Sequence, residues 1–512
     1  MEKKKIVILV EILAILIVIL FVGSAQVVTP FFGDINFIDE GQFGAWAAHM
    51  LFGKLMYKDI YIPYGPLYVY PLYILFKIFG ASAFLTRLYL SLCSFAGALI
   101  INFMLARLVI KRVIRLLTVF LVIALGATQV RYALGLLCVY CLLRATQQKT
   151  WKSFVVLGML LAATFLFSPE IGIFSLAAAL SYFTFGLMKG PITSTAKYTL
   201  LTIAGTLAVA VSFTVWSHHE GWFIDYLKTT LDALLSFSGI GLPNGQNFPN
   251  ALTFLPNLLS QQMFLYWTIF FYIVCLFYIF TRCVTNSLNK QDALAFGVTL
   301  YGILLYTILI GRSGHYFGII APMLILAAFF VTKLISLRQS GRDKVFATLI
   351  IILLCLFSVR LLSVFRPNFN RLTQLPNAFF SKKNNPALVG PITISQAQES
   401  HIKSLQSFIS KNTNKKDNIF FFDNEPMFYL LTNRPNPTRY DLPYLANSYM
   451  MRLEIIRSLQ KDAPKYIFFD PSAWSVDGVP NTQRLPEVAE FIKKNYHSVA
   501  EADKVIVYRH NE

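Results

Sequence analysis

Charged residues are scarce in this chain of 512 residues, and acidic residues are the scarcest of them. Asp, Glu, Lys and Arg together make up 14% of the sequence, whereas an ordinary soluble domain has about 25%. Hydrophobic residues reach 56%, and the mean hydropathy is +0.56. This composition excludes a purely soluble globular protein and places the chain in the membrane class.

The last part of the chain contains no cysteine, and the sequence contains no nucleotide-binding motif. No cysteine follows Cys355, so the last part of the chain cannot hold a disulfide framework. Cys138-x-x-Cys141 lies inside an apolar run, which favours buried packing over a redox or metal pair. The sequence contains neither a GxxxxGK[ST] phosphate loop nor a dinucleotide fingerprint, so nothing supports nucleotide hydrolysis.

The net charge of +19 does not indicate a nucleic-acid-binding protein. Residues 1–365 carry 26 Lys and Arg against 12 Asp and Glu, and residues 366–512 carry 19 against 14. Most of the excess lies in short loops between apolar runs, where basic residues set the orientation of a membrane protein. We therefore expect membrane lipids, and no nucleic acid, among the partners.

The apolar runs predict about eleven transmembrane helices within residues 1–365. Lys3, Lys4 and Lys5 place the N-terminus in the cytoplasm, and the first run is read as an uncleaved span. The predicted spans are Ile6–Val22, Thr86–Leu108, Ile114–Gln129, Tyr132–Leu143, Phe154–Phe167, Ile171–Met188, Tyr198–Trp216, Met263–Phe280, Ala293–Ile310, Phe317–Val331 and Val345–Val364.

This topology places two large loops and the C-terminal tail outside the cell membrane. Residues 31–85 form the first outer loop with two interfacial helices, and residues 217–262 form the second. Residues 366–512 predict a small extracytoplasmic α/β domain, since helix-like and strand-like segments alternate there. The helix-like segments are Ile402–Ile409, Met450–Leu459 and Val488–Asn495, and the strand-like segments are Asn418–Phe422, Tyr466–Phe469 and Lys504–Tyr508.

Three acids cluster in the first outer loop of a chain that otherwise has few. They are Asp34, Asp39 and Glu40, and an amphipathic helix follows them. The simplest interpretation is that they are solvated or that Asp39 caps the helix. The alternative is a catalytic base, because basic groups recur on the other outer loops. A carboxylate facing cations suits group transfer from a phosphate-linked donor: the base takes a proton and the cations stabilise the leaving phosphate.

The sequence here resembles the polytopic GT-C glycosyltransferases. The resemblance rests on Asp39-Glu40-Gly41, Leu51-Phe-Gly53, Tyr57-x-Asp59 and the residues up to Arg87. It is strongest to the bacterial branch related to protein O-mannosyltransferases and the lipid A aminoarabinose transferase. The resemblance implies a polyprenyl-phosphate-linked sugar as donor, and a glycan, a lipid or a protein as acceptor. In plan it covers the whole chain, although only residues 34–87 carry specific motifs.

The resemblance also implies roles for individual residues. Asp39 takes the position of the family's usual catalytic base, and Glu40 that of its partner. Some relatives carry a Glu-Lys-Pro motif where this chain has Pro63-Tyr-Gly-Pro66, so a lysine for the donor phosphate is missing. Lys58, Arg312 and His315 are the candidates that replace it.

Other charged residues of the outer loops are candidates for the substrate groove. They are Asp34, Asp59, Arg87, Arg131, Glu170, Glu220 and Asp225. We expect no cofactor. His218, His219 and Glu220 are adjacent and have no evident third ligand, so no motif supports a divalent metal.

Two other classes of protein fit the same hydropathy. A transporter or flippase of lipid-linked glycans would place functional charges in broken helices near the membrane centre. If the protein is a non-enzymatic envelope scaffold, the cluster of Asp34, Asp39 and Glu40 has no catalytic function. Within the enzyme class, a glycan polymerase would differ only in using a lipid-linked acceptor.

Overall fold

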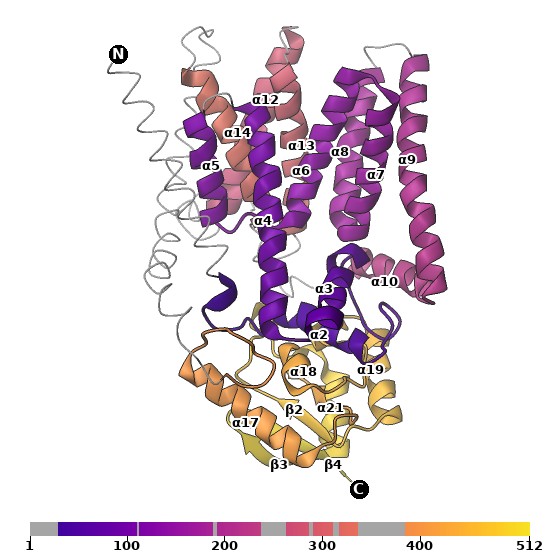
Figure 1. Cartoon of the computed structure of the whole chain (residues 1–512), viewed down its shortest axis with the longest axis vertical. Coiled ribbons are helices and arrows are strands. Elements are labelled where there is room, and N and C mark those ends of the chain that lie inside the picture. The colour runs from indigo at the N-terminus through magenta and orange to yellow at the C-terminus, as the bar shows by residue number, and fades with distance from the viewer. Residues whose placement is uncertain are drawn as a thin grey trace, which may run out of the picture. The chain divides into compact units, whose positions relative to one another are not determined.

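The computed structural model describes residues 29–109, 112–187, 192–236, 263–285, 290–310, 317–335 and 385–511 (Figure 1). The chain forms two compact units. Unit 1 includes Leu92–Ser212 and the described parts of Asn244–Leu375; unit 2 includes Thr29–Ser91 and the described parts of Phe213–Pro243 and Pro376–Glu512. The first and last predicted spans lie outside the described residues, as do Arg312 and His315.

Every predicted span within the described residues coincides with a helix. These helices are α4 (Ala83–Leu108), α5 (Arg112–Ala124), α6 (Val130–Gln148), α7 (Trp151–Phe167), α8 (Pro169–Leu187), α9 (Ile192–His219), α12 (Met263–Val284), α13 (Lys290–Ile310) and α14 (Phe317–Ile335). Among them, Ala83–Leu108 and Ala196–His219 are long and apolar enough to cross a membrane by length and composition alone.

The helix ends differ from the predicted ones because hydropathy marks apolar residues and not helical ones. Helix α6 continues past Leu143 through polar residues that favour a helix, and it ends where Lys149 adopts a left-handed conformation with φ of 52°. Helix α5 ends at Ala124 and not at Gln129, because Gly126 turns the chain with φ of 68°.

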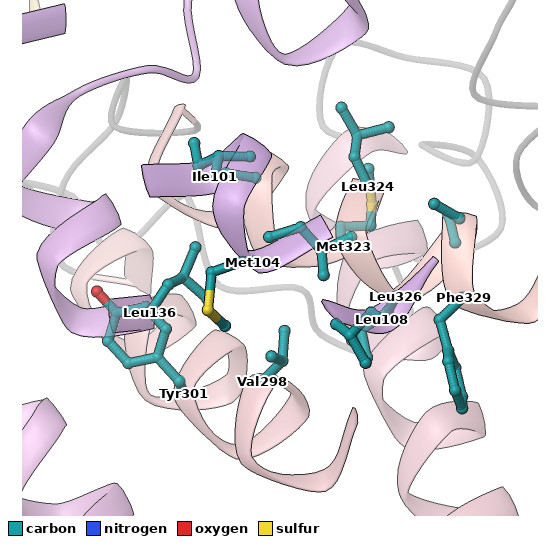
Figure 2. Packing of buried hydrophobic residues seen from close by; sticks show 14 of the residues in the cluster. Ile101, Met104, Leu108, Leu136, Val298, Tyr301, Met323, Leu324, Leu326 and Phe329 are labelled. Carbon is teal, nitrogen blue, oxygen red and sulfur yellow. The ribbon is translucent and has the colours of Figure 1, made fainter. Parts of the chain in front are cut away.

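The core of unit 1 is a cluster of buried apolar side chains from several helices (Figure 2). Ile101 and Met104 of α4 belong to it together with Leu136 of α6 and Tyr301 of α13. The hydroxyl of Tyr301 donates a hydrogen bond to the carbonyl oxygen of Tyr132 at 2.9 Å. A buried tyrosine is stable here because its hydroxyl is satisfied by that carbonyl.

Helices α7 and α9 approach closely through two glycines. A Cβ atom on Gly158 would lie 1.9 Å from the carbonyl oxygen of Thr202, and one on Gly205 would lie 2.1 Å from that of Val155. Thr206 of α9 donates from its hydroxyl to the carbonyl oxygen of Gly158 at 3.2 Å. Small residues of this kind allow helix backbones to pack against each other where lipid offers no hydrophobic driving force.

Unit 2 combines the first outer loop with a small mixed sheet. Its helices in the first part of the chain are η1 (Thr29–Phe31), α2 (Asp39–Leu51), α3 (Pro66–Phe79), the start of α4, and α10 (Phe223–Ser236). Its later helices are α17 (Gln396–Asn412), α18 (Met427–Thr432), η3 (Pro443–Leu445), α19 (Tyr449–Lys461), η4 (Val476–Gly478), α20 (Asn481–Arg484) and α21 (Pro486–Asn495). Helix α3 occupies the segment predicted to form an interfacial helix.

The sheet has four strands in the order β1-β2-β4-β3. They are β1 (Phe420–Phe421), β2 (Tyr466–Phe469), β3 (Tyr496–Ala502) and β4 (Val505–His510). Strands β1 and β2 are parallel, and the other pairs are antiparallel. Three strands were predicted and are confirmed. Strand β3 was not predicted, because its mostly exposed, weakly apolar side chains carry little of the usual alternation.

The first outer loop is built into this α/β domain. The backbone of Gly33 donates to the carbonyl oxygen of Thr393 at 2.9 Å, and Thr393 donates to that of Phe31 at 2.7 Å. The ring of Tyr61 stacks on that of Tyr440 with 5.2 Å between centroids. The predicted domain boundary at residue 365 remains a prediction, but residues from both of its sides share the core of unit 2.

We predict that Gly158→Leu destabilises unit 1. The added side chain has to push α7 and α9 apart, which costs about 1–3 kcal/mol of packing free energy. Thermal unfolding of the detergent-purified variant should therefore occur at a lower temperature than that of the wild type. Val156→Leu, on the exposed side of the same helix, is the control and should leave the transition unchanged. Equal midpoints for both variants would show that this helix contact is not tight.

Candidate active site

Asp39 is the first residue of α2, and the side chain of Asn36 holds it there. Asn36 Oδ1 accepts hydrogen bonds from the backbone nitrogens of Ile38 at 3.0 Å and Asp39 at 2.9 Å. Asn36 Nδ2 donates to Asp39 Oδ2 at 3.0 Å. Asp39 thus does not cap the helix through its own side chain, and the capping interpretation is wrong. Its exposed carboxylate lies at the helix N-terminus, where the helix dipole stabilises negative charge.

Glu40 forms an ion pair with Arg87 of α4. Arg87 Nε donates to both carboxylate oxygens of Glu40 at 3.0 Å, and Arg87 Nη2 lies 2.9 Å from Oε2. Burial raises the pKa of Glu40 above its usual value, and the charge of Arg87 opposes that shift. Fork-like contacts of this kind fix both partners in one geometry.

Arg87 also holds the backbone that leads to α2. Its Nη1 donates to the carbonyl oxygens of Phe32 at 3.3 Å and Gly33 at 2.8 Å, and its Nη2 donates to that of Asp34 at 2.8 Å. The side chain is 3% exposed, so each of these bonds replaces water that burial has removed. Arg87, which was predicted to line the substrate groove, therefore stabilises the backbone around the acids.

Asp34 and Asp59 are bound to backbone groups as well. Asp34 accepts from the backbone nitrogen of Ser395 at 2.6 Å and from its hydroxyl at 3.0 Å, at the residue that caps α17. Asp59 accepts from the backbone nitrogen of Leu55 at 2.9 Å, within the turn that contains Lys58. Both oxygens of Asp34 are bonded, as are both oxygens of Glu40.

Asp39 differs from Asp34 and Glu40 in one respect. Within the part of the chain that the structure describes, its Oδ1 atom accepts no hydrogen bond, whereas Oδ2 is held by Asn36. The carboxylate is therefore oriented through one oxygen and open through the other. An exposed carboxylate held in this way can act as a general base, because its free oxygen can approach the proton of a substrate hydroxyl.

Aromatic rings lie one helical turn beyond Asp39. Phe43 follows Asp39 by four residues and so shares its face of α2. Its ring lies 5.3 Å from Trp46, 4.7 Å from Tyr68 and 5.7 Å from the half-buried Tyr64, on which it stacks. Sequence reasoning did not assign Tyr64 to the site, although the Pro63-Tyr-Gly-Pro66 turn that contains it was singled out in the sequence.

Two of the three lysines of the first outer loop, Lys54 and Lys58, have different surroundings. Lys58 is exposed, and its ammonium forms no ion pair within the described residues. Lys54 donates to the carbonyl oxygen of Asn436, and burial lowers the pKa of its ammonium. Lys54 is thus fixed to the C-terminal domain, whereas Lys58 keeps its charge available to a ligand.

The remaining predicted site residues divide between the two units. In unit 1, Arg131 Nη1 of α6 lies 3.3 Å from Glu170 Oε1 of α8, and both side chains are largely buried. In unit 2, Glu220 follows α9 and Asp225 lies in the first turn of α10. Neither acid forms an ion pair within the described residues.

One buried pair escaped sequence reasoning altogether. His49 Nε2 of α2 lies 2.8 Å from Asp441 Oδ1, and each side chain is 1% exposed. Asn436 Nδ2 donates to the same oxygen at 2.8 Å. This pair joins the far end of α2 to the C-terminal domain, so α2 is held at both of its ends.

We predict that Arg87→Met destabilises unit 2. Removing one partner of a buried ion pair leaves Glu40 without its counterion, at a cost of about 3–5 kcal/mol. The variant should unfold at a lower temperature, and limited proteolysis should cleave the segment before α2 sooner than in the wild type. Arg457→Met, at an exposed position of α19, is the matched control. Wild-type stability in Arg87→Met would contradict the role given to the ion pair.

Comparison with known proteins adds one finding about the fold. No family model matches the sequence, and no curated protein matches it significantly. Among solved structures, ArnT from Cupriavidus metallidurans in the apo state is similar with a TM-score of 0.50 and 12% identity, over 99% of this chain and 98% of that chain. The same protein bound to undecaprenyl phosphate has a TM-score of 0.47 and 11% identity, with 97% of each chain covered. The chain therefore has a GT-C-like fold: an α-helical polytopic membrane protein with a small C-terminal α/β domain.

Proposed function

We propose that the chain is a membrane glycosyltransferase that moves a sugar from a polyprenyl-phosphate donor to an acceptor hydroxyl. The GT-C-like fold supports the general kind of protein, since ArnT is a lipid A aminoarabinose transferase with that fold. The same likeness supports a multi-pass location in the cell membrane. We propose further that the N-terminus is cytoplasmic, that the reaction takes place on the outer face, and that the acceptor is a glycan, a lipid or a protein.

The observation that carries the proposal is the state of the Asp39 carboxylate. It is exposed, it is oriented by Asn36 through one oxygen, and its other oxygen accepts no hydrogen bond among the described residues. Its neighbour Glu40 is bound on both oxygens by Arg87. The two acids of the motif thus have different tasks: Asp39 can react, and Glu40 positions the start of α2.

The reaction follows from this arrangement. Asp39 Oδ1 takes the proton of the acceptor hydroxyl as the hydroxyl oxygen attacks the anomeric carbon of the donor sugar. The bond between that carbon and the phosphate oxygen breaks, and the phosphate leaves with its lipid. A positioned base of this kind contributes about 10²–10⁴-fold to the rate. The resemblance to the family implies inversion at the anomeric carbon.

Cations are needed where the phosphate charge develops. Lys58 is exposed in the turn after α2, and Arg312 and His315 are the further donor-phosphate residues that we propose. Cations already in place stabilise a leaving phosphate without reorganisation during the reaction. The half-buried ring of Tyr64, which stacks on the buried ring of Phe43, offers an apolar surface against which the less polar face of a sugar can pack.

We predict that Asp39→Asn abolishes transfer, lowering the rate by about 10²–10⁴-fold, because the amide cannot accept the proton. The assay incubates the reconstituted protein with an extract of host membranes that contains both the polyprenyl-phosphate sugars and the glycan, lipid and protein acceptors. Mass spectrometry then follows the conversion of the glycosylated lipid to the free polyprenyl phosphate. Asp462→Asn, an exposed acid at the end of α19, is the matched control and should retain wild-type activity.

Two results would reject the proposal. Full activity in Asp39→Asn, at wild-type membrane abundance, would exclude this residue as the base. A wild-type protein that moves the lipid-linked sugar across the bilayer while leaving the sugar–phosphate bond intact would identify a flippase.

A further inference from the structure

A second group of chemically active side chains lies within the C-terminal domain, apart from the residues used above. Asp470 directly follows β2, and Asp423 comes two residues after β1. Because β1 and β2 are parallel, both acids lie at the same edge of the sheet. In open sheets with parallel strands, the carboxyl ends of the strands are the usual place for a binding site.

Two further side chains complete the group. Glu425 lies just before α18, and His401 lies in α17. His401, Glu425 and Asp470 each offer one ligand atom, and the three atoms lie within 4.8 Å of one another. One imidazole and two carboxylates, contributed by three separate segments, form a donor set typical of metal sites in proteins.

Asp423 orients two of these three ligands. Its Oδ1 accepts from the backbone nitrogen of Glu425 at 3.1 Å, and its Oδ2 accepts from that of Asp470 at 3.2 Å. One oxygen of Asp470 is fixed in addition by the backbone nitrogen and the hydroxyl of Ser472, both at 2.6 Å. The acids are therefore held together by the fold and are not free to separate.

Glu425 lacks the partner that its surroundings require. Its Oε2 atom is buried and has no hydrogen-bond partner in the part of the chain that the structure describes. No lysine or arginine among those residues forms an ion pair with Asp423, Glu425 or Asp470. A buried carboxylate among other carboxylates is costly unless a cation compensates it.

His401 is held in the manner of a metal ligand. Its Nδ1 atom lies 2.6 Å from Asp503 Oδ2, in the turn between β3 and β4. A carboxylate on one ring nitrogen fixes the tautomer and leaves the other nitrogen as a ligand, and metal-binding histidines almost always have such a partner. Asp503 does not belong to the group of three acids, so this contact is independent of them.

We propose that His401, Glu425 and Asp470 bind a divalent transition-metal ion such as Zn²⁺. Asp423 and Asp503 are positioning residues for this site. The imidazole favours a first-row transition metal over Mg²⁺ and Ca²⁺, which prefer oxygen ligands alone. The ion would supply the missing partner of Glu425 and neutralise the buried acids.

The site also connects to the loop that precedes Asp39. The ring of His401 lies 6.2 Å from that of Phe37 and 5.4 Å from that of Phe428, and those two rings are 4.7 Å apart. The backbone nitrogen of Met427 donates to the carbonyl oxygen of Phe37 at 3.2 Å. A bound ion would therefore stiffen the segment that leads into α2. Its binding does not depend on the proposed transferase activity.

The test measures Zn²⁺ binding by the full-length protein in detergent, with the affinity tag removed and metals stripped by a chelator. Zinc is titrated against a fluorescent competitor, and Mg²⁺ and Ca²⁺ are titrated in parallel. We expect one tight Zn²⁺ site in the wild type and in His497→Gln, an exposed histidine that serves as the control. His401→Gln and Glu425→Gln should bind at least about 10-fold more weakly, and Asp503→Asn about 10–100-fold more weakly.

A stability measurement separates loss of the site from loss of the fold. Without metal, Glu425→Gln should unfold at the wild-type temperature or above it, because the amide keeps the shape of the side chain and removes one acid from a crowded group of acids. Added Zn²⁺ should raise the unfolding temperature of the wild type and of His497→Gln, but not that of Glu425→Gln. Wild-type protein that binds no Zn²⁺, or equal affinities in wild type, His401→Gln and Glu425→Gln, would overturn the proposal.

Discussion

The buried guanidinium of Arg87 is the interaction on which the candidate active site depends. It binds both oxygens of Glu40 and three backbone carbonyls that precede α2, so it fixes the helix start and the approaching chain together. At the other end of α2, the buried pair of His49 and Asp441 anchors the helix to the C-terminal domain. A helix held at both ends presents its first residue, Asp39, in a fixed position, which is what a catalytic group requires.

The three acids of the first outer loop show how burial and bonding assign different tasks to the same functional group. Both carboxylate oxygens of Asp34 accept hydrogen bonds from Ser395, and both oxygens of Glu40 are bound by Arg87. Asp39 keeps one oxygen free of hydrogen bonds within the described residues, and its carboxylate is exposed, so it is the most accessible of the three to a substrate. At the proposed metal site, the buried Oε2 atom of Glu425 has no hydrogen-bond partner within the described parts of the chain, and a cation is the group that would satisfy it.

Much of the fold could be predicted from the sequence, because apolar runs and alternation are local signals. They located the described helices of the membrane region and three of the four strands. Helix α10 was missed, although Leu227, Thr230 and Leu231 follow one another at helical spacing, because it was read as part of a loop. A sequence motif pointed to Asp39 as a candidate site residue. The same motif did not reveal which residues bind the side chains around it. His49 and Asp441 are 392 residues apart, and no local pattern reveals such a pair.

The central claim is that the protein handles a polyprenyl-phosphate-linked sugar, and its bound lipid reports on this most directly. The measurement is mass spectrometry of the lipids that co-purify with the wild-type protein and with Arg312→Ala. We expect a polyprenyl phosphate or its glycosylated form in the wild type, with a marked loss in the variant, because a proposed cation for the phosphate has been removed. Bulk phospholipid alone in both preparations would contradict it.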